Sequence, residues 1–243
     1  MAWDHKSMRR ATIPELLDDD LGTPDEIAAS LADLRAINLR FGGTSTTLSL
    51  LRRIAARSGA RTLTMLDVAS GSGELSLAVQ QRLGMDGIEL AVTLLDRRAS
   101  HVKGSAAAAI CGDALRLPFA DNAFDVVSSS LFAHHLQPDE VRQFVLESLR
   151  VCRRAVLIND LIRSRLHLCL VYAALPLFRS RLTRHDAPAS VHNAYTVREM
   201  RRVLQEASPA AVEFSRHFFY RMGVLIWKGG QPAGVGASPH KLL

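Results

Sequence analysis

Five short apolar runs, separated by segments with helical periodicity, constrain the fold of this 243-residue chain more than any other feature. Runs of this length fit buried strands, whereas the segments between them place apolar residues three and four positions apart, as on one face of a helix. Strands that alternate with helices form parallel sheets with helices on both faces. The runs span residues 62–68, 88–96, 106–113, 124–130 and 154–160.

The chain closes with two further apolar runs, residues 212–218 and 222–228, that are only a few residues apart. A parallel crossover needs a dozen or more residues, so these two strands must be antiparallel. The sequence therefore predicts an α/β fold: a Rossmann-like, seven-stranded, mostly parallel sheet with helices on both faces and a C-terminal antiparallel hairpin.

The sequence predicts the start of a helix at two places. Thr23, Pro24 and Glu26 combine an N-cap, a proline in the first turn and a capping-box acid, and Thr196 with Glu199 repeats the capping box. Two more helices are predicted between strands. One has its apolar face at Leu75, Ala78, Val79 and Leu83 with a stop at Gly84, and the other follows Pro138 with a face at Val141, Phe144, Val145, Leu149 and Cys152.

Composition indicates one globular domain over residues 1–228, followed by a flexible Gly- and Pro-rich tail over 229–243. Residues 1–60 form its N-terminal helical part, and residues 161–196 are predicted to be an insertion that acts as a substrate lid. No signal peptide is expected, and the longest apolar run, 166–178, is shorter than the roughly 18 residues of a membrane span. Three cysteines do not indicate a disulfide framework, so a cytoplasmic location is expected.

The first strand ends in Asp67 and is followed by the loop ASGSG and a helix that begins near Glu74. Small residues let such a turn approach a ligand closely, and a helix start offers unpaired N–H groups. The next two strands end in Asp96 and Asp113. In an open parallel sheet, ligands bind outside the carboxyl ends of the strands, so these three acids predict a nucleotide site there.

The glycine pattern of this loop separates two classes of nucleotide. A dinucleotide fingerprint needs G-x-G-x-x-G, but here Gly71 and Gly73 are followed by Ser76 in the third place. Asp67 and Glu74 would also flank a pyrophosphate with negative charge. A ligand with a positive centre suits the loop better, although a nicotinamide-dependent oxidoreductase stays as an alternative.

The run LDVASGSGE, the acid in LLD, the stretch GDALRLPFADNAFDVVSSSLFAHHL and the final hairpin together resemble the class I S-adenosylmethionine-dependent methyltransferases. More narrowly, the chain resembles the bacterial small-molecule group called methyltransferase type 11, or ubiquinone/menaquinone-methyltransferase-like, over roughly residues 35–228. The resemblance implies S-adenosyl-L-methionine as cofactor and S-adenosyl-L-homocysteine as product.

By this resemblance, Asp67 and the loop hold the methionine part, Asp96 binds the ribose hydroxyls, and Asp113 meets the adenine. The implied cofactor-binding residues are Asp67, Ala69, Ser70, Gly71, Gly73, Asp96, Arg97, Asp113, Ala114, Ser130 and Leu131. Ala69 departs from the family's D-x-G-x-G-x-G pattern. It is harmless at negative φ but costly at positive φ, where it would weaken cofactor binding.

Methyl transfer from a sulfonium is an in-line displacement, so it needs no metal, and none is predicted. The candidate general bases are His134 and His135 after the fourth strand, and His185 in the insertion. For both residues of the His134–His135 pair, a structural role at the start of a helix is the alternative.

The insertion combines apolar residues with five arginines, which predicts a small apolar or aromatic acceptor, with room for an anionic group. A dimer contact or a core helix is the alternative, and a monomer or homodimer is expected.

The net charge of +6 leaves a nucleic-acid methyltransferase or binder as a second function. The sequence SSLF after the fourth strand does not match the motif of amino-methylating DNA enzymes, so a nucleic-acid partner is not favoured.

Overall fold

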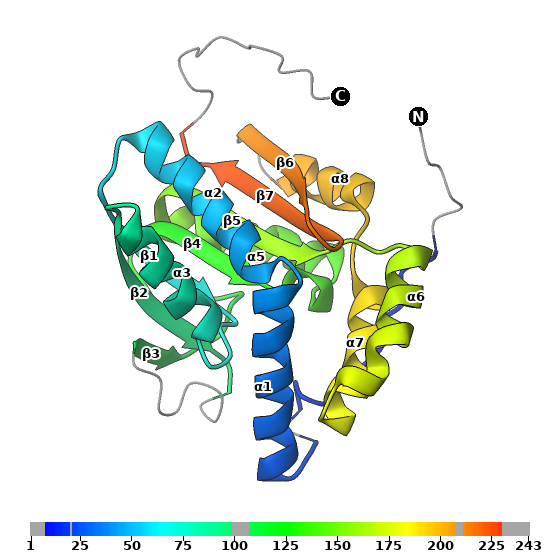
Figure 1. Ribbon diagram of the computed structural model, residues 1–243. Coiled ribbons are helices and arrows are strands. Elements are labelled where there is room, and N and C mark those ends of the chain that lie inside the picture. The colour runs from blue at the N-terminus through cyan, green and yellow to red at the C-terminus, as the bar shows by residue number, and fades with distance from the viewer. Residues whose placement is uncertain (1–7, 20, 99–106, 208–210, 230–243) are drawn as a thin grey trace, which may run out of the picture.

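The computed structural model describes residues 8–19, 21–98, 107–207 and 211–229, and it contains one seven-stranded sheet in the order β3-β2-β1-β4-β5-β7-β6 (Figure 1). Each predicted strand is present within a few residues of its expected bounds. The strands are β1 (Thr62–Val68), β2 (Glu89–Asp96), β3 (Ala108–Cys111), β4 (Phe124–Ser130), β5 (Cys152–Leu161), β6 (Ala211–His217) and β7 (Arg221–Trp227).

The pairing of the strands confirms the predicted topology. Strands β1 to β5 are mutually parallel, whereas β7 pairs antiparallel with both β5 and β6. The hairpin turn between β6 and β7 places Phe219 and Tyr220 at positive φ, the conformation of tight two-residue hairpin turns. Strand order reverses between β1 and β4, so the carboxyl ends of these two strands open a crevice.

Helices cover both faces of the sheet. One face packs against α2 and α3 through residues such as Ile54 and Val79, and the other packs against α5 and α8 through Phe144 and Met200. The helices are α1 (Pro24–Arg40), α2 (Gly43–Ser58), α3 (Glu74–Met85), α5 (Pro138–Val151), α6 (Arg165–Ala174), α7 (Arg181–Asn193) and α8 (Val197–Ala207), with short 3-10 turns η1 (Ala133–His135) and η2 (Leu175–Leu177).

Both predicted capping boxes are formed. At the start of α1, the Thr23 backbone N–H donates to Glu26 Oε2 over 2.8 Å, and the Glu26 N–H donates back to Thr23 Oγ1. At the start of α8, the Thr196 N–H donates to Glu199 Oε2, also over 2.8 Å. These contacts fix where the helices begin, because each pairs a backbone donor that the helix cannot satisfy itself.

Two predicted boundaries are wrong by a few residues. Cys152 is the first residue of β5 rather than the last of α5, since α5 ends at Val151 and the chain enters the strand without a linker. Gly84 lies within α3, and the helix ends one residue later, with Asp86 as its C-cap. The predicted tail lies outside the described residues except for Gly229.

Three helices stand together away from the main sheet: α1, α6 and α7 (Figure 1). The N-terminal strap, residues 8–19, runs along α7. Asn193 bonds the backbone of Ile13 in both directions, and the Asp186 carboxylate accepts the N–H groups of Leu16 and Leu17. Among the residues that the structure describes, none of the helices combines the length and apolar character needed to cross a bilayer.

Candidate functional site

A cavity of about 770 Å³ opens at the carboxyl ends of β1, β2 and β4. The loops that follow these strands line one part of it, and α1, α6, α7 and the N-terminal strap line the rest. Of the predicted cofactor residues, the cavity wall includes Ala69, Ser70, Gly71, Asp96, Arg97, Asp113, Ala114, Ser130 and Leu131. The structure thus brings together residues from four different loops, as the sequence predicted.

The loop after β1 turns sharply through left-handed backbone conformations at Ala69 (φ +55°), Gly71 (φ +53°) and Gly73 (φ +74°). A Cβ atom on Gly73 would lie 2.3 Å from Leu94 Cδ1, so this position has no room for a side chain. At Gly71 a Cβ would meet no atom within 4 Å. Ala69 is the one residue of the three that is not a glycine, and its positive φ is the conformation that is costly for an alanine.

Asp67 lies behind the loop and does not line the cavity. Its Oδ2 accepts a 2.6 Å hydrogen bond from Ser76 Oγ, whereas its buried Oδ1 has no partner among the described residues. Burial, helped by the nearby charge of Asp96 and opposed by the Ser76 bond, raises the pKa of Asp67 to about 7. A cationic ligand near the loop would favour the ionised form of this carboxyl.

Asp96 connects the loops after β1 and β2. Its Oδ2 accepts the Gly71 N–H and its Oδ1 accepts the Arg98 N–H, both over 2.9 Å. The carboxylate thereby fixes the backbone that borders the cavity. The resemblance gave Asp96 only a role toward ribose, and the structure adds this structural role.

Further along the cavity, Asp113 Oδ1 accepts the Leu115 N–H over 2.9 Å, which shapes the loop after β3. Leu131 is at φ +55°, and its N–H donates to the carbonyl of Asn159. Ser130 places a buried Oγ at the cavity wall that has no hydrogen-bond partner among the described residues. A bound ligand would offer such an atom a partner.

His134 is buried in the turn η1, and its side chain is only 2% exposed. The Asp160 carboxylate accepts both the backbone N–H and, over 2.7 Å, Nδ1 of His134. Burial disfavours the imidazolium, but Asp160 and Glu15 outweigh it and raise the pKa of His134 to about 10. An imidazole held in this way is a weak candidate for the general base that the sequence predicts.

His135 lies beside His134, with ring centroids 4.2 Å apart. Its Nδ1 is 2.8 Å from Asp18 Oδ2, and it lines the cavity. His185 pairs with Asp186 over 2.8 Å, is about half exposed and does not line the cavity. The structure thus places two of the three predicted bases at the site and the third outside it.

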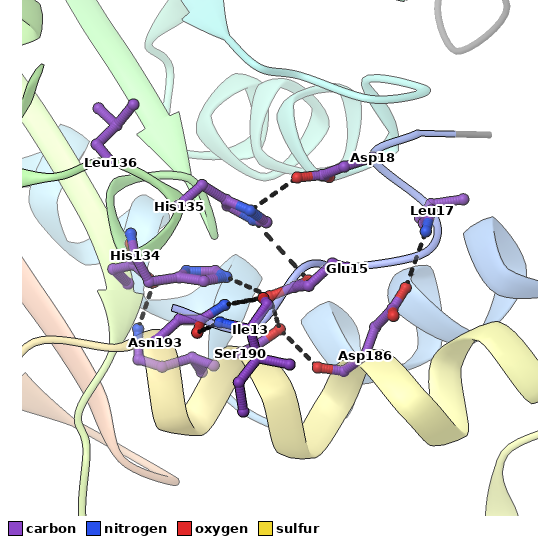
Figure 2. Close-up of polar contacts among 12 residues, drawn as sticks. Ile13, Glu15, Leu17, Asp18, His134, His135, Leu136, Asp186, Ser190 and Asn193 are labelled. Carbon is purple, nitrogen blue, oxygen red and sulfur yellow. Dashed lines mark hydrogen bonds and ion pairs between the residues drawn. The ribbon is translucent and has the colours of Figure 1, made fainter. Parts of the chain in front are cut away.

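The sequence interpretation missed three residues at the site: Glu15 and Asp18 on the strap, and Arg221 at the start of β7. Glu15 Oε1 lies 3.5 Å from His134 Nε2, although the two residues are far apart in the chain (Figure 2). No local pattern marks Glu15 or Asp18, because they stand in a segment of mixed charge. Arg221 opens a strand that otherwise reads as a plain apolar run.

The remaining wall is largely apolar. It is built by α1, α6, the turn η2 and α7, and its apolar members are Leu31, Leu34, Ile37, Leu170, Val171, Ala174, Leu177, Phe178 and Val191. The predicted insertion, residues 161–196, therefore does supply part of the cavity wall.

The residues present fit S-adenosylmethionine. Gly71 leaves open space beside the loop, and Ser130 Oγ is a buried oxygen at the cavity wall that has no partner among the described residues. Oxygen atoms of this kind suit the hydroxyl and ammonium groups of such a ligand, since both groups donate hydrogen bonds.

Comparison with known proteins agrees with this geometry. Residues 66–158 match the family described as methyltransferase domain. A demethylmenaquinone methyltransferase of Desulfitobacterium hafniense is 31% identical over an alignment of 99 residues, and the match covers 37% of this chain. The match spans only 38% of the length of that relative.

Solved structures share the fold over more of the chain. The plantazolicin methyltransferase BpumL in complex with SAH covers 88% of this chain and 94% of its own, with a TM-score of 0.65 and 14% identity. A SAM-dependent methyltransferase from Aquifex aeolicus covers 86% of this chain and 96% of its own, with a TM-score of 0.54 and 17% identity. With the family match over residues 66–158, these likenesses show that the chain has the fold of S-adenosylmethionine-dependent methyltransferases.

Proposed function

We propose that the chain transfers a methyl group from S-adenosylmethionine to a small apolar or aromatic acceptor. A single observation carries this proposal. One continuous cavity is lined both by the loops after β1, β2, β3 and β4 and by the apolar wall of α1, α6 and α7. A donor held by the loops and an acceptor held by the wall would therefore share one cavity.

Bound S-adenosylmethionine supplies an electrophilic methyl group on a sulfonium. The protein's part is to hold the acceptor in line with that methyl, and orientation of this kind lowers barriers by roughly 7–11 kcal/mol. Asp96 fixes the loop of Gly71, and the apolar wall with the strap excludes water from the acceptor. For an acceptor that must lose a proton, His135 at the cavity wall is the base we propose, because His134 is held by Asp160 and His185 does not line the cavity.

Arg221 supports an acceptor that carries an anionic group. This guanidinium is buried at the cavity wall, and its hydrogen bonds go to the neutral oxygens of Phe41 and Asn38. Its Nη1 has no partner among the described residues, and burial lowers the pKa of Arg221 to about 10, against the opposing charge of Asp160. A buried cation without a carboxylate partner is costly, so a carboxylate on the acceptor would stabilise it.

Calorimetry tests the donor. S-adenosylhomocysteine is titrated into the full chain, with NAD and NADP as controls, and binding of S-adenosylhomocysteine alone is expected. Binding of NAD or NADP without S-adenosylhomocysteine would refute the proposal and favour an oxidoreductase.

A radiolabelled methyl donor then tests the acceptor. Hydroxylated aromatic acids are compared with their methyl esters and with a short RNA and a short DNA duplex. We expect transfer to the small aromatic compounds, with the acids preferred. Transfer to nucleic acid alone would replace the proposed acceptor with the alternative that the basic composition left open.

A further inference from the structure

We propose that Glu15, His134 and His135 form a binding site for a divalent transition-metal ion. The sequence predicted no metal, because in-line methyl transfer needs none. Glu15 lies on the N-terminal strap, and the two histidines lie in η1, far from it in the chain. Folding places the strap between η1 and α7, and Figure 2 shows both imidazole rings directed toward the Glu15 carboxylate.

The distances among the three side chains fit a metal of zinc size. Each residue offers one ligand atom, and these atoms lie within 4.8 Å of one another. Glu15 Oε1 is 3.5 Å from His134 Nε2, and Glu15 Oε2 is 4.0 Å from His135 Nε2. Ligands at about 2.0–2.1 Å from a tetrahedral zinc ion are about 3.3 Å apart, so small side-chain rotations complete the geometry.

The other ring nitrogens are already held as they are in metal sites. His134 Nδ1 is 2.7 Å from Asp160 Oδ1, and His135 Nδ1 is 2.8 Å from Asp18 Oδ2. A carboxylate that accepts the Nδ1 proton leaves the Nε2 lone pair free for an ion and fixes the ring orientation. Two independent carboxylate–imidazole pairs that converge on one further carboxylate are more specific than a cluster of acids.

Burial and space favour an ion at this point. His134 Nε2 is buried without a direct hydrogen bond among the described residues, and the Glu15 side chain is 9% exposed. Ser190 Oγ donates to Glu15 Oε1 over 2.8 Å, which orients the carboxylate. All three ligand residues also line a second pocket of about 160 Å³ beside the main cavity, which leaves room for water as a further ligand.

The charges around the site are unequal. Three carboxylates, those of Glu15, Asp18 and Asp160, surround two imidazoles, and the same small pocket contains the guanidinium of Arg97. Asp19 also lines this pocket but is paired with Arg98. Once a metal ion replaces the proton that the raised pKa holds on His134, the other groups sum to two negative charges, which a divalent cation neutralises. Two imidazoles and a carboxylate form a ligand set typical of zinc, cobalt or ferrous iron.

The experiment uses zinc and cobalt alone as probes and does not depend on the proposed methyl transfer. The full chain is stripped with a chelator, dialysed and titrated with zinc by calorimetry at pH 7.5, while cobalt gives visible absorption bands that report the ligands. We expect one zinc ion per chain. Glu15→Gln and His135→Ala should each weaken binding at least tenfold, and Asp18→Asn should weaken it less.

His217→Ala is the matched control, because it removes an imidazole that pairs with Ser215 in β6 and contacts neither the strap nor Asp186 in the hydrogen bonds of the described residues. It should bind zinc like the unmodified chain. Circular dichroism verifies that each variant is folded. Zinc affinity no tighter than millimolar, or affinity that neither Glu15→Gln nor His135→Ala changes, would overturn the proposal, since an ion would then be absent or bound elsewhere, as at the exposed thiols of Cys111 and Cys169. Binding of S-adenosylhomocysteine, measured on the same samples, tests the proposed function separately.

Discussion

Ala69→Gly is expected to stabilise the protein, which is unusual for a change of alanine to glycine. Ala69 is held at φ +55° in the loop after β1. The left-handed conformation costs an L-residue roughly 1–2 kcal/mol, and glycine avoids this cost. Glycine loses about 0.5–1 kcal/mol more backbone entropy on folding. At the middle of both ranges, the net gain in the free energy of unfolding is about 0.75 kcal/mol, and the extremes run from about 0 to about 1.5 kcal/mol.

Thermal unfolding measures this gain. For a chain of this size, 1 kcal/mol shifts the Tm by about 2–4 °C, so Ala69→Gly should raise the Tm by about 1–4 °C. Ala78→Gly is the matched control. Ala78 lies inside α3 with ordinary helical geometry, where glycine costs about 1 kcal/mol, so its Tm should fall by a similar amount.

Both variants replace alanine with glycine, but the Tm is expected to rise for Ala69→Gly and to fall for Ala78→Gly. The pair therefore distinguishes relief of backbone strain from the general effect of adding a glycine. If Ala69→Gly lowers the Tm as Ala78→Gly does, the alanine is not strained and the reasoning fails. The strain relief applies to the free and the bound protein alike. Affinity for S-adenosylhomocysteine should therefore change less than about threefold. The sequence alone predicts instead that positive φ at Ala69 weakens cofactor binding, and calorimetry on the two proteins decides between these predictions.

Three further predictions concern single side chains at the site. Burial raises the folded-state pKa of Asp67 to about 7, above the ordinary value of 3.8 for an aspartate, so the folded state retains a proton that the unfolded state releases. The stabilisation by this group is therefore present below about pH 4 and is lost as the pH rises toward 7, and it amounts to at most about 4 kcal/mol. In Asp67→Asn, the free energy of unfolding measured with urea should therefore depend less on pH between pH 5 and 7.5. Asp96→Ala should weaken S-adenosylhomocysteine at least tenfold by calorimetry, about 1.4 kcal/mol, and an unchanged affinity would remove Asp96 from the cofactor site. Arg221→Met should raise KM for aromatic acids more than for their methyl esters, and equal effects on both would rule out an anion contact.

The sheet was predictable because each strand carries its own signal. Buried strands in a parallel sheet are apolar on both faces, so the run at residues 62–68 coincides with β1 to the residue. The signal weakens at the sheet edge. Strand β3 has four residues and is largely exposed, and the predicted run 106–113 overstates its length. At Cys152 the apolar pattern continues from α5 directly into β5, so periodicity does not mark the boundary.

The candidate site also has one part that the sequence predicts and another part that it does not. Its donor half is encoded locally, since Asp96, Asp113 and the glycine loop each stand at a strand end where topology brings them together. Its other half depends on contacts between distant segments. Glu15 acquires its position from the hydrogen bonds that join the strap to Asn193 and Asp186 of α7. In each of them a backbone N–H of the strap donates to a side-chain oxygen, and such a contact leaves no periodic pattern in the sequence. A change at Asp186, which touches neither histidine, should therefore displace Glu15 from His134, and this dependence is why the second half of the site could be found only in the folded chain.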